Sequence, residues 1–121
     1  AILIKENHIM AAGSLQQAVA QAKQQSPNIF IEVEVETLEE LKMALTLDVD
    51  RIMLDNFSLA EINQAVIMTA RRIPLEVSGN VSLNQLPELS KTGVDFISTG
   101  AITKHLRAID LSMRFEMEKQ N

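Results

Sequence analysis

Apolar residues recur at helical spacing in four stretches of the chain, and a capping residue precedes each stretch. In the first stretch, Leu15, Ala18 and Val19 fall on one helical face. A Ser or Thr before a helix accepts a backbone hydrogen bond, and a Glu or Gln three residues later completes a capping box. The pairs with this spacing are Ser14 with Gln17, Thr37 with Glu40, and Ser58 with Glu61. These patterns predict three helices that begin just after Ser14, Thr37 and Ser58.

The fourth stretch is less regular than the other three. A helix counted from Ser82 would place Pro87 in its interior, where the missing N–H removes a hydrogen bond. We therefore expect this helix to begin nearer Asn84. Its predicted last turn is Lys91–Gly93, because a glycine commonly ends a helix.

Short runs of apolar and β-branched residues lie between the helical stretches. The predicted strands are Ile2–Ile4, Ile29–Val35, Arg51–Leu54, Pro74–Val77 and Phe96–Ser98. The last four end roughly 20 residues apart, which is about what a strand, a loop and a crossover helix need. Strands this short and apolar, joined by helices, should run parallel with both faces covered. The predicted fold class is therefore α/β, either as an open doubly wound sheet or as a (β/α) barrel.

Unusual residues at the carboxyl ends of the strands favour the barrel. They are Lys5, Glu34 with Glu36, Asp55 with Asn56, Ser78–Asn80 and Ser98–Gly100. That rim is where barrel enzymes build their active sites, often with phosphate held by the loops after the last two strands. About five strands, each followed by a helix, cannot close an eight-stranded barrel of roughly 250 residues. We therefore predict a partial TIM-like barrel, a fragment of a larger one, over residues 1–115, with a polar tail at 116–121.

Composition and charge narrow the classes of function. The chain has 46% hydrophobic and 22% charged residues, which is ordinary for a folded domain. It has no cysteine, which excludes disulfides, thiolate zinc sites and cysteine nucleophiles. A net charge of −5 argues against a nucleic-acid partner, and no apolar run approaches the roughly 20 residues that cross a bilayer. We expect a cytoplasmic protein without a membrane or nucleic-acid partner.

Three glutamates point to one face of the second predicted strand. Glu32, Glu34 and Glu36 alternate with valines, so successive carboxylates lie about 6 to 7 Å apart. One interpretation is a solvated edge strand. In a parallel barrel the same face is the interior, where a bare carboxylate is very costly and needs a partner. Lys5, at the end of the first strand, is a candidate partner, although a surface lysine is the alternative.

Asp55 and Asn56 follow the apolar third strand, where a buried segment reaches the surface. One interpretation is a turn or capping pair, since both residue types favour such positions. The other is a carboxylate placed for ribose hydroxyls, or for a Mg²⁺ ion that also touches phosphates. His8 is assigned either to a loop after the first strand or to a position behind the residues that contact substrate.

Two small-residue turns complete the candidate chemistry. Ser78–Asn80 and Thr99–Ala101 each lie between a predicted strand and a predicted helix. Glycine lets the backbone approach an anion, and free N–H groups at a helix start favour negative charge. Two such turns on adjacent units predict a phosphate-binding site.

The motifs around these residues resemble quinolinate phosphoribosyltransferase, also called carboxylating nicotinate-nucleotide pyrophosphorylase. The resemblance covers Leu3–Phe115 and is carried by LIKENHI, EVEVETLEEL, IMLDNFS, EVSGNVS and TGVDFISTGAITKH, in this order. It implies transfer of the phosphoribosyl group of phosphoribosyl pyrophosphate to quinolinate, with loss of CO₂ and pyrophosphate, to give nicotinate mononucleotide. Mg²⁺ is the implied cofactor.

The resemblance also implies roles for individual residues. Lys5 is implied to contact substrate, and Glu34 and Asp55 to face the ribose hydroxyls and the metal. The turns implied to hold the 5′-phosphate are Ser78, Gly79 and Asn80, and Thr99, Gly100 and Ala101.

This chain departs from the family pattern in three ways. The family often has glycine where this chain has Asn80, and valine where it has Thr99; both changes leave the turns small. The family residues that grip the quinolinate carboxylates lie before Lys5, as does a further domain that completes the partner subunit's site. We therefore expect a homodimer or larger homo-oligomer for the full-length protein, and no turnover from this chain alone.

Two other interpretations stay open. The chain could belong to another phosphate-binding barrel or to a sister phosphoribosyltransferase, which upstream sequence would distinguish. It could also be a truncated partner subunit without catalysis, which should bind no phosphoribosyl pyrophosphate.

Overall fold

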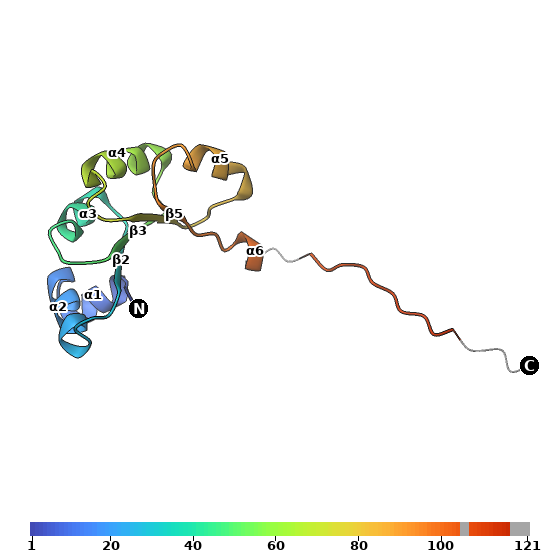
Figure 1. Ribbon diagram of the computed structural model, residues 1–121, viewed down its shortest axis with the longest axis horizontal. Helices are drawn as coiled ribbons and strands as arrows, with labels where there is room; N and C mark the ends of the chain where they lie inside the picture. The colour runs from blue at the N-terminus through green and yellow to red at the C-terminus, as the bar shows by residue number, and fades with distance from the viewer. Residues whose placement is uncertain (105–106, 117–121) are drawn as a thin grey trace, which may run out of the picture.

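The computed structural model describes residues 1–104 and 107–116, in which strands and helices alternate (Figure 1). The elements are β1 (Ile2–Ile4), α1 (Glu6–Ala12), α2 (Leu15–Gln25), β2 (Ile31–Val35), α3 (Leu38–Ala44), β3 (Arg51–Asp55), α4 (Leu59–Thr69), β4 (Leu75–Ser78), η1 (Leu83–Gln85), α5 (Leu86–Leu89), β5 (Phe96–Ile97) and α6 (Ala101–Lys104).

The strands form one parallel sheet in the order β1-β2-β3-β4-β5, so neighbours in sequence are neighbours in space. Figure 1 shows the sheet as a curve with α2, α3, α4 and α5 along its outer side. The predicted α/β class with about five parallel strands is confirmed. Because the strands are parallel, all their carboxyl ends lie at the same edge of the sheet.

Alternate residues of the strands face the helices and form the core. Ile31, Val33, Ile52 and Leu54 have no exposed surface. The helices cover them with buried apolar side chains, which are Leu15, Ala18, Val19, Leu41, Ala44, Ile62, Ala65 and Leu89. The positions between them, on the other face of the sheet, are largely polar: Lys5, Glu32, Glu34, Arg51, Met53, Asp55, Glu76, Ser78 and Phe96.

The predicted N-caps at Ser14, Thr37 and Ser58 are confirmed, whereas the predicted capping box forms at Ser58 and not at Ser14 or Thr37. The hydroxyl groups of Ser14, Thr37 and Ser58 each accept a hydrogen bond from the backbone N–H three residues on. Glu61 completes a capping box by accepting from the Ser58 N–H at 2.8 Å. These bonds satisfy backbone donors that a helix start leaves free.

The prediction that His8 lies in a loop is wrong, because a helix follows the first strand at once. Lys5 is the N-cap of α1, and its N–H donates to His8 Nδ1 at 3.0 Å, so the imidazole takes the capping role usually filled by Glu or Gln. Two alanines support the helix, and Gly13 ends it at φ 94°.

The predicted start of the fourth helix near Asn84 lies between the observed starts of η1 and α5, but the prediction missed that Ser82 serves as the cap. A 3-10 turn begins after Ser82, whose N–H donates to Gln85 Oε1 at 2.8 Å. Pro87 then lies in the first turn of α5, where no intrahelical N–H bond is needed. The helix ends at Leu89, before the predicted Lys91–Gly93 turn, although Gly93 does adopt a left-handed φ of 95°.

Strand boundaries differ from prediction by one or two residues. β2 begins at Ile31 because the Ile29 N–H closes a turn onto the Ser26 carbonyl at 3.1 Å. The chain after α6 is extended over 107–116, and residues 117–121 of the predicted polar tail lie outside the described residues. Within the described ranges, no helix is long and apolar enough to cross a membrane.

Candidate functional site

Lys5 and Glu34 form an ion pair at the carboxyl edge of β1 and β2. Lys5 Nζ lies 2.6 Å from Glu34 Oε2, and the glutamate side chain is only 9% exposed while the lysine is about half exposed. The hydrogen bond to Glu34 raises the pKa of Lys5, which keeps the ammonium charged. The expectation that an interior-facing carboxylate needs a partner is met here, and Lys5 is that partner.

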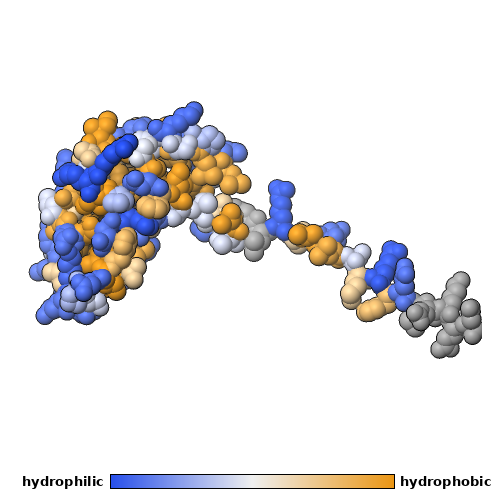
Figure 2. All heavy atoms as spheres, viewed as in Figure 1, coloured by the Kyte–Doolittle hydropathy of each residue, from blue (hydrophilic) through white to orange (hydrophobic). Residues whose placement is uncertain are grey.

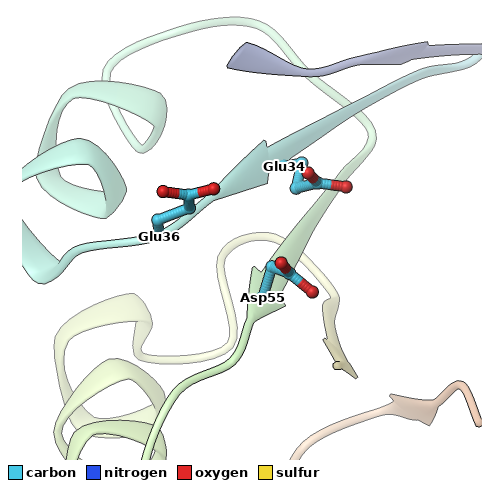
Figure 3. A group of neighbouring side chains, drawn as sticks. All are labelled: Glu34, Glu36 and Asp55. Carbon is cyan, nitrogen blue, oxygen red and sulfur yellow. The ribbon is translucent and has the colours of Figure 1, made fainter. Parts of the chain in front are cut away.

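Asp55 and Glu36 extend the carboxylate group. One oxygen from each of Glu34, Glu36 and Asp55 lies within 4.8 Å of the others (Figure 3). Glu34 comes from β2, Asp55 ends β3, and Glu36 follows β2 directly. The sequence analysis placed Glu36 at the same rim and on the same face as Glu34, but it assigned metal and substrate roles to Glu34 and Asp55 only.

Negative charge accumulates around this carboxylate group. A hydrogen bond with Glu6 raises the pKa of Glu36, and the nearby charges of Glu40 and Asp55 add to the effect. A pocket lined by Glu6, Glu34, Glu36 and Glu40, with apolar residues of α1, lies beside the group. The concentration of acids at this edge favours a cationic ligand.

A second polar network lies on the same face of the sheet, beside the carboxylate group. Arg51 Nη1 lies 2.8 Å from Glu76 Oε2 and 3.9 Å from Glu32 Oε2, and its guanidinium stacks over the Phe96 ring with 4.0 Å to the centroid. Glu76 also accepts a hydrogen bond from the Ser98 hydroxyl. The network therefore joins β2, β3, β4 and the turn that follows β5.

Burial and hydrogen bonding act differently on the two carboxyls of this network. Burial, together with the neighbouring Glu76 charge, raises the pKa of Glu32. Burial would also raise the pKa of Glu76, but hydrogen bonds from Ser98 and Arg51 outweigh it and lower that pKa. The sequence analysis missed the network, because only Glu32 and Arg51 are register partners, while the register partner of Glu76 on β3 is Met53.

The first glycine turn, Ser78–Asn80, adopts a backbone that needs small residues. Gly79 has φ 86° and Asn80 has φ 44°, both in the left-handed region. A Cβ atom on Gly79 would lie 2.3 Å from Asn56 Oδ1, so a side chain cannot fit there without displacing Asn56.

The second turn, Thr99–Ala101, is tied to the chain that follows the first. The Thr99 hydroxyl donates to the Val81 carbonyl at 2.6 Å and accepts from the Ala101 N–H at 3.2 Å. The two turns are therefore neighbours at one edge of the sheet. The Lys104 side chain lies over Gly100, with its ammonium 3.8 Å from where a Cβ would stand, and this cation was not among the predicted site residues.

The structure thus brings the predicted residues together in two adjacent groups. Lys5, Glu34 and Asp55 form one, and the turns Ser78–Asn80 and Thr99–Ala101 form the other. Asn56 contacts both, because its backbone N–H donates to the Ser78 carbonyl at 3.1 Å and its side chain donates to Asp55 Oδ2 at 2.8 Å.

Comparisons with known proteins identify the family to which the chain belongs. Residues 1–114 match the family model described as quinolinate phosphoribosyl transferase, C-terminal domain. The chain is 36% identical to a probable carboxylating nicotinate-nucleotide pyrophosphorylase of Bacillus subtilis, covering 99% of this chain and 42% of that protein. It is 42% identical to the protein of the same name from Synechocystis, covering 94% of this chain and 40% of that protein. The chain therefore spans about two fifths of the length of these relatives.

Solved structures give the same result for the fold. The chain superposes on the nicotinate-nucleotide pyrophosphorylase of Francisella tularensis with a TM-score of 0.85 and 53% identity, over 93% of this chain and 40% of that one. For NadC from Streptococcus pyogenes the TM-score is 0.84 at 40% identity, over 95% and 41% of the two chains. The prediction of a fragment of a larger (β/α) domain is confirmed. The chain belongs to the quinolinate phosphoribosyltransferase family, whose C-terminal domain it matches.

Proposed function

We propose that this chain supplies the phosphoribosyl-binding edge of an enzyme that transfers the phosphoribosyl group of phosphoribosyl pyrophosphate to quinolinate. The products would be nicotinate mononucleotide, pyrophosphate and CO₂, in NAD biosynthesis. Because the chain spans about 40% of the length of its relatives, turnover by the whole protein is part of the proposal.

One observation carries the proposal. The carboxylate group around Glu34 and Asp55 lies at the same sheet edge as two neighbouring small-residue turns. Asn56 contacts this group through Asp55 and contacts the first of the two turns through Ser78. A sugar phosphate has the matching polarity, because its hydroxyls and electron-poor carbon suit carboxylates and its phosphate suits backbone N–H groups and a lysine.

In this proposal the carboxylates act on charge that develops during the reaction. As pyrophosphate leaves, the ribose carbon becomes cationic, and Glu34 and Asp55 stabilise that charge in the transition state. Their oxygens are already gathered on the sheet edge, so little rearrangement is needed when the charge appears. Lys5 keeps Glu34 oriented through its ion pair and presents an ammonium to the anionic substrate.

The phosphate end would be held by the two turns. Backbone N–H groups of Ser78–Asn80 and Thr99–Ala101 would bind the 5′-phosphate, with the Lys104 ammonium beside the second turn. Holding the far end of the substrate fixes where the reacting carbon lies, which lowers the entropic part of the barrier.

We also propose Mg²⁺ as the cofactor. The available donors fit this ion, because Glu34, Glu36 and Asp55 each offer a hard carboxylate oxygen within 4.8 Å of the others. When bound, Mg²⁺ would offset negative charge on the departing pyrophosphate. Glu34 and Asp55 would hold it, with Glu36 as the additional ligand.

A cytoplasmic homodimer is the proposed setting. A chain without cysteine has no disulfide to lose, so a reducing compartment is permitted. The described sheet is open at both β1 and β5, where the remaining strands of a larger (β/α) barrel would pair, so the homodimer is proposed from the family resemblance.

Calorimetry with phosphoribosyl pyrophosphate in Mg²⁺ tests the proposal on the chain itself. We expect saturable binding that weakens by about tenfold or more in Glu34→Gln and in Asp55→Asn, because each variant removes a charged hydrogen-bonding group. Glu39→Gln is the matched control, since Glu39 is an exposed carboxylate on α3 that pairs with Lys42. That variant should bind like the parent chain.

The outcomes separate the possible functions. No heat from the parent chain would contradict the proposed site and favour a partner subunit without catalysis. Equal losses of affinity in Glu39→Gln and Glu34→Gln would mean that binding depends on the net charge of the chain and not on the position of Glu34. We further expect no quinolinate-dependent pyrophosphate release from the 121-residue chain by itself, and observed release would overturn that part of the proposal.

A further inference from the structure

Asn56 lies between the carboxylate group and the first glycine turn, and its side chain bonds to both. Its Nδ2 donates to Asp55 Oδ2 at 2.8 Å, and its Oδ1 accepts from Asn80 Nδ2 at 3.4 Å. Its backbone N–H donates to the Ser78 carbonyl at 3.1 Å. One residue thus makes three contacts across the end of β3 and the turn after β4.

The orientation of the Asn56 amide follows from its neighbours. A carboxylate can only accept hydrogen bonds, so the amide nitrogen must face Asp55. The amide oxygen is then left to face the Asn80 amide nitrogen, which is a donor. An aspartate at position 56 would lose the donor and set a second negative charge against Asp55.

The backbone conformation of Asn56 also contributes to these contacts. Its φ of 56° is in the left-handed region, which asparagine tolerates better than most residues. This conformation turns the amide back against Gly79, where an added Cβ would stand 2.3 Å from Oδ1 and 2.7 Å from Cγ. Gly79 and Asn56 therefore fit together as a pair.

We propose that Asn56 is a positioning residue that fixes the Asp55 carboxylate relative to the Ser78–Asn80 turn. The inference rests on the proposed function, since it assigns to Asn56 the spacing between the ribose-binding carboxylate and the phosphate-binding turn. Asn56 acts through Asp55 and the turn rather than on the reacting atoms. Its loss should therefore disturb both groups even though the predicted binding residues are all present.

Binding of phosphoribosyl pyrophosphate in Mg²⁺ to the 121-residue chain and its variants tests this role. Asn56→Gly keeps the left-handed backbone and removes the amide, and we expect affinity to fall about tenfold, equivalent to about 1.4 kcal/mol. Asn80→Ala removes the longer of the two side-chain bonds, and we expect a loss of about threefold. Asn63→Ala is the control, because Asn63 is an exposed asparagine whose amide bonds only within α4, to the Leu59 carbonyl at 2.9 Å.

A second readout separates positioning from loosening of the fold. The side-chain carboxyl resonance of Asp55, measured by carbon NMR at fixed neutral pH, should shift in Asn56→Gly and stay in place in Asn63→Ala. Urea unfolding of each variant identifies any that fails to fold, and Asn56→Asp then replaces Asn56→Gly, with the same expected loss of affinity and the same shift.

Each outcome decides a different claim. If the parent chain binds and Asn56→Gly binds within about twofold of it, the role of Asn56 is wrong while the proposed function stands. If Asn56→Gly binds weakly but the Asp55 resonance does not move, the role is wrong as well. If neither the parent chain nor Asn63→Ala binds, the proposed function fails and the role of Asn56 fails with it.

Discussion

The two faces of the sheet are built from the same strands, but one is apolar and the other is charged. The helix-facing side carries Ile31, Val33, Ile52 and Leu54, none of which has exposed surface. The other side carries charged residues at the alternate positions, and two of them, Glu34 and Glu76, are buried as well. The first face stabilises the fold by removing apolar surface from water. The second holds charge in place at some expense of stability.

Charged residues persist on the second face because each has a nearby partner. Lys5 pairs with Glu34, and Arg51 pairs with Glu76 and lies near Glu32. Even so, Glu32 Oε1 and Arg51 Nε are buried without a hydrogen-bond partner within the described part of the chain. A buried ion pair usually stabilises no more than apolar residues of similar size would. This face is therefore better explained by ligand binding than by stability.

The largest expected effect comes from the helix-facing side. Leu54→Ala should lower the free energy of unfolding by about 3 kcal/mol, because it opens a cavity in a fully buried site. Met53, the residue before Leu54, is half-buried on the opposite face, and Met53→Ala should lower the free energy of unfolding by about 1 kcal/mol. Urea unfolding of both variants measures the difference. Equal losses would mean that the two faces do not differ as described.

The Arg51 network gives the next largest effect. Glu76→Gln should destabilise the chain by about 2 kcal/mol at neutral pH, because Arg51 loses its 2.8 Å partner while remaining mostly buried. Glu32→Gln should change stability by less than about 1 kcal/mol, because the raised pKa of Glu32 shows that its site favours a neutral side chain. A larger loss in Glu32→Gln than in Glu76→Gln would reverse this assignment.

The same pair predicts opposite dependences on pH. The lowered pKa of Glu76 contributes stability above its unfolded value of 4.5, and this is lost as pH falls through the folded pKa. The raised pKa of Glu32 acts in reverse, since stability falls as pH rises from 4.5 through the folded pKa. Glu32→Gln should therefore gain stability relative to the parent as pH rises above 4.5, as unfolding curves recorded at a series of pH values would show.

The sequence predicted the helix-facing side better than the charged side. Strand and helix positions followed from the apolar spacing, and the caps at Ser14, Thr37 and Ser58 followed from side-chain chemistry that acts within a few residues. The helix at Glu6–Ala12 was missed because its N-cap, Lys5, and the His8 side chain that bonds back to it are not usual capping residues. The 3-10 turn before Pro87 was missed because the sequence alone did not show how the chain would accommodate the proline.

The sequence selected residues that the structure brings together, but it did not predict the contacts between them. Lys5, Glu34 and Asp55 could be chosen because each stands at a strand end. The contacts that link Asp55 through Asn56 to Gly79 could not be predicted, because they depend on left-handed backbone angles at separate turns. The Arg51 network depends on the register between neighbouring strands. The sequences of five short parallel strands do not specify that register without the helices that connect them.

A smaller effect is expected from a helix cap that serves only the covering layer. Ser58→Ala should lower the free energy of unfolding by about 1 kcal/mol, because the first turn of α4 loses a hydrogen-bond acceptor. Ser58→Asp keeps an acceptor and should restore most of that loss. In Ser58→Ala, the pKa of Glu61 should return toward its ordinary value, since the Ser58 hydroxyl is the main cause that lowers it. Carboxyl NMR titration of Glu61 reads this change directly.

The smallest expected effect on stability belongs to Lys5, although it is central to the proposed function. The ammonium is about half exposed, so water screens its pair with Glu34. A glutamine at position 5 still offers the buried Glu34 carboxylate an N–H donor, so Lys5→Gln should change the free energy of unfolding by only about 0.5 kcal/mol at neutral pH. Because the pKa of Lys5 is raised, whatever the pair contributes is present below the ordinary value of 10.5 and is lost as pH rises through the folded pKa. Unfolding at neutral and alkaline pH measures this, with Lys42→Gln on α3 as the control for an exposed lysine pair. A loss from Lys5→Gln as large as that from Leu54→Ala would mean that the charged face carries the fold, which would remove the reason to assign its charges to a ligand.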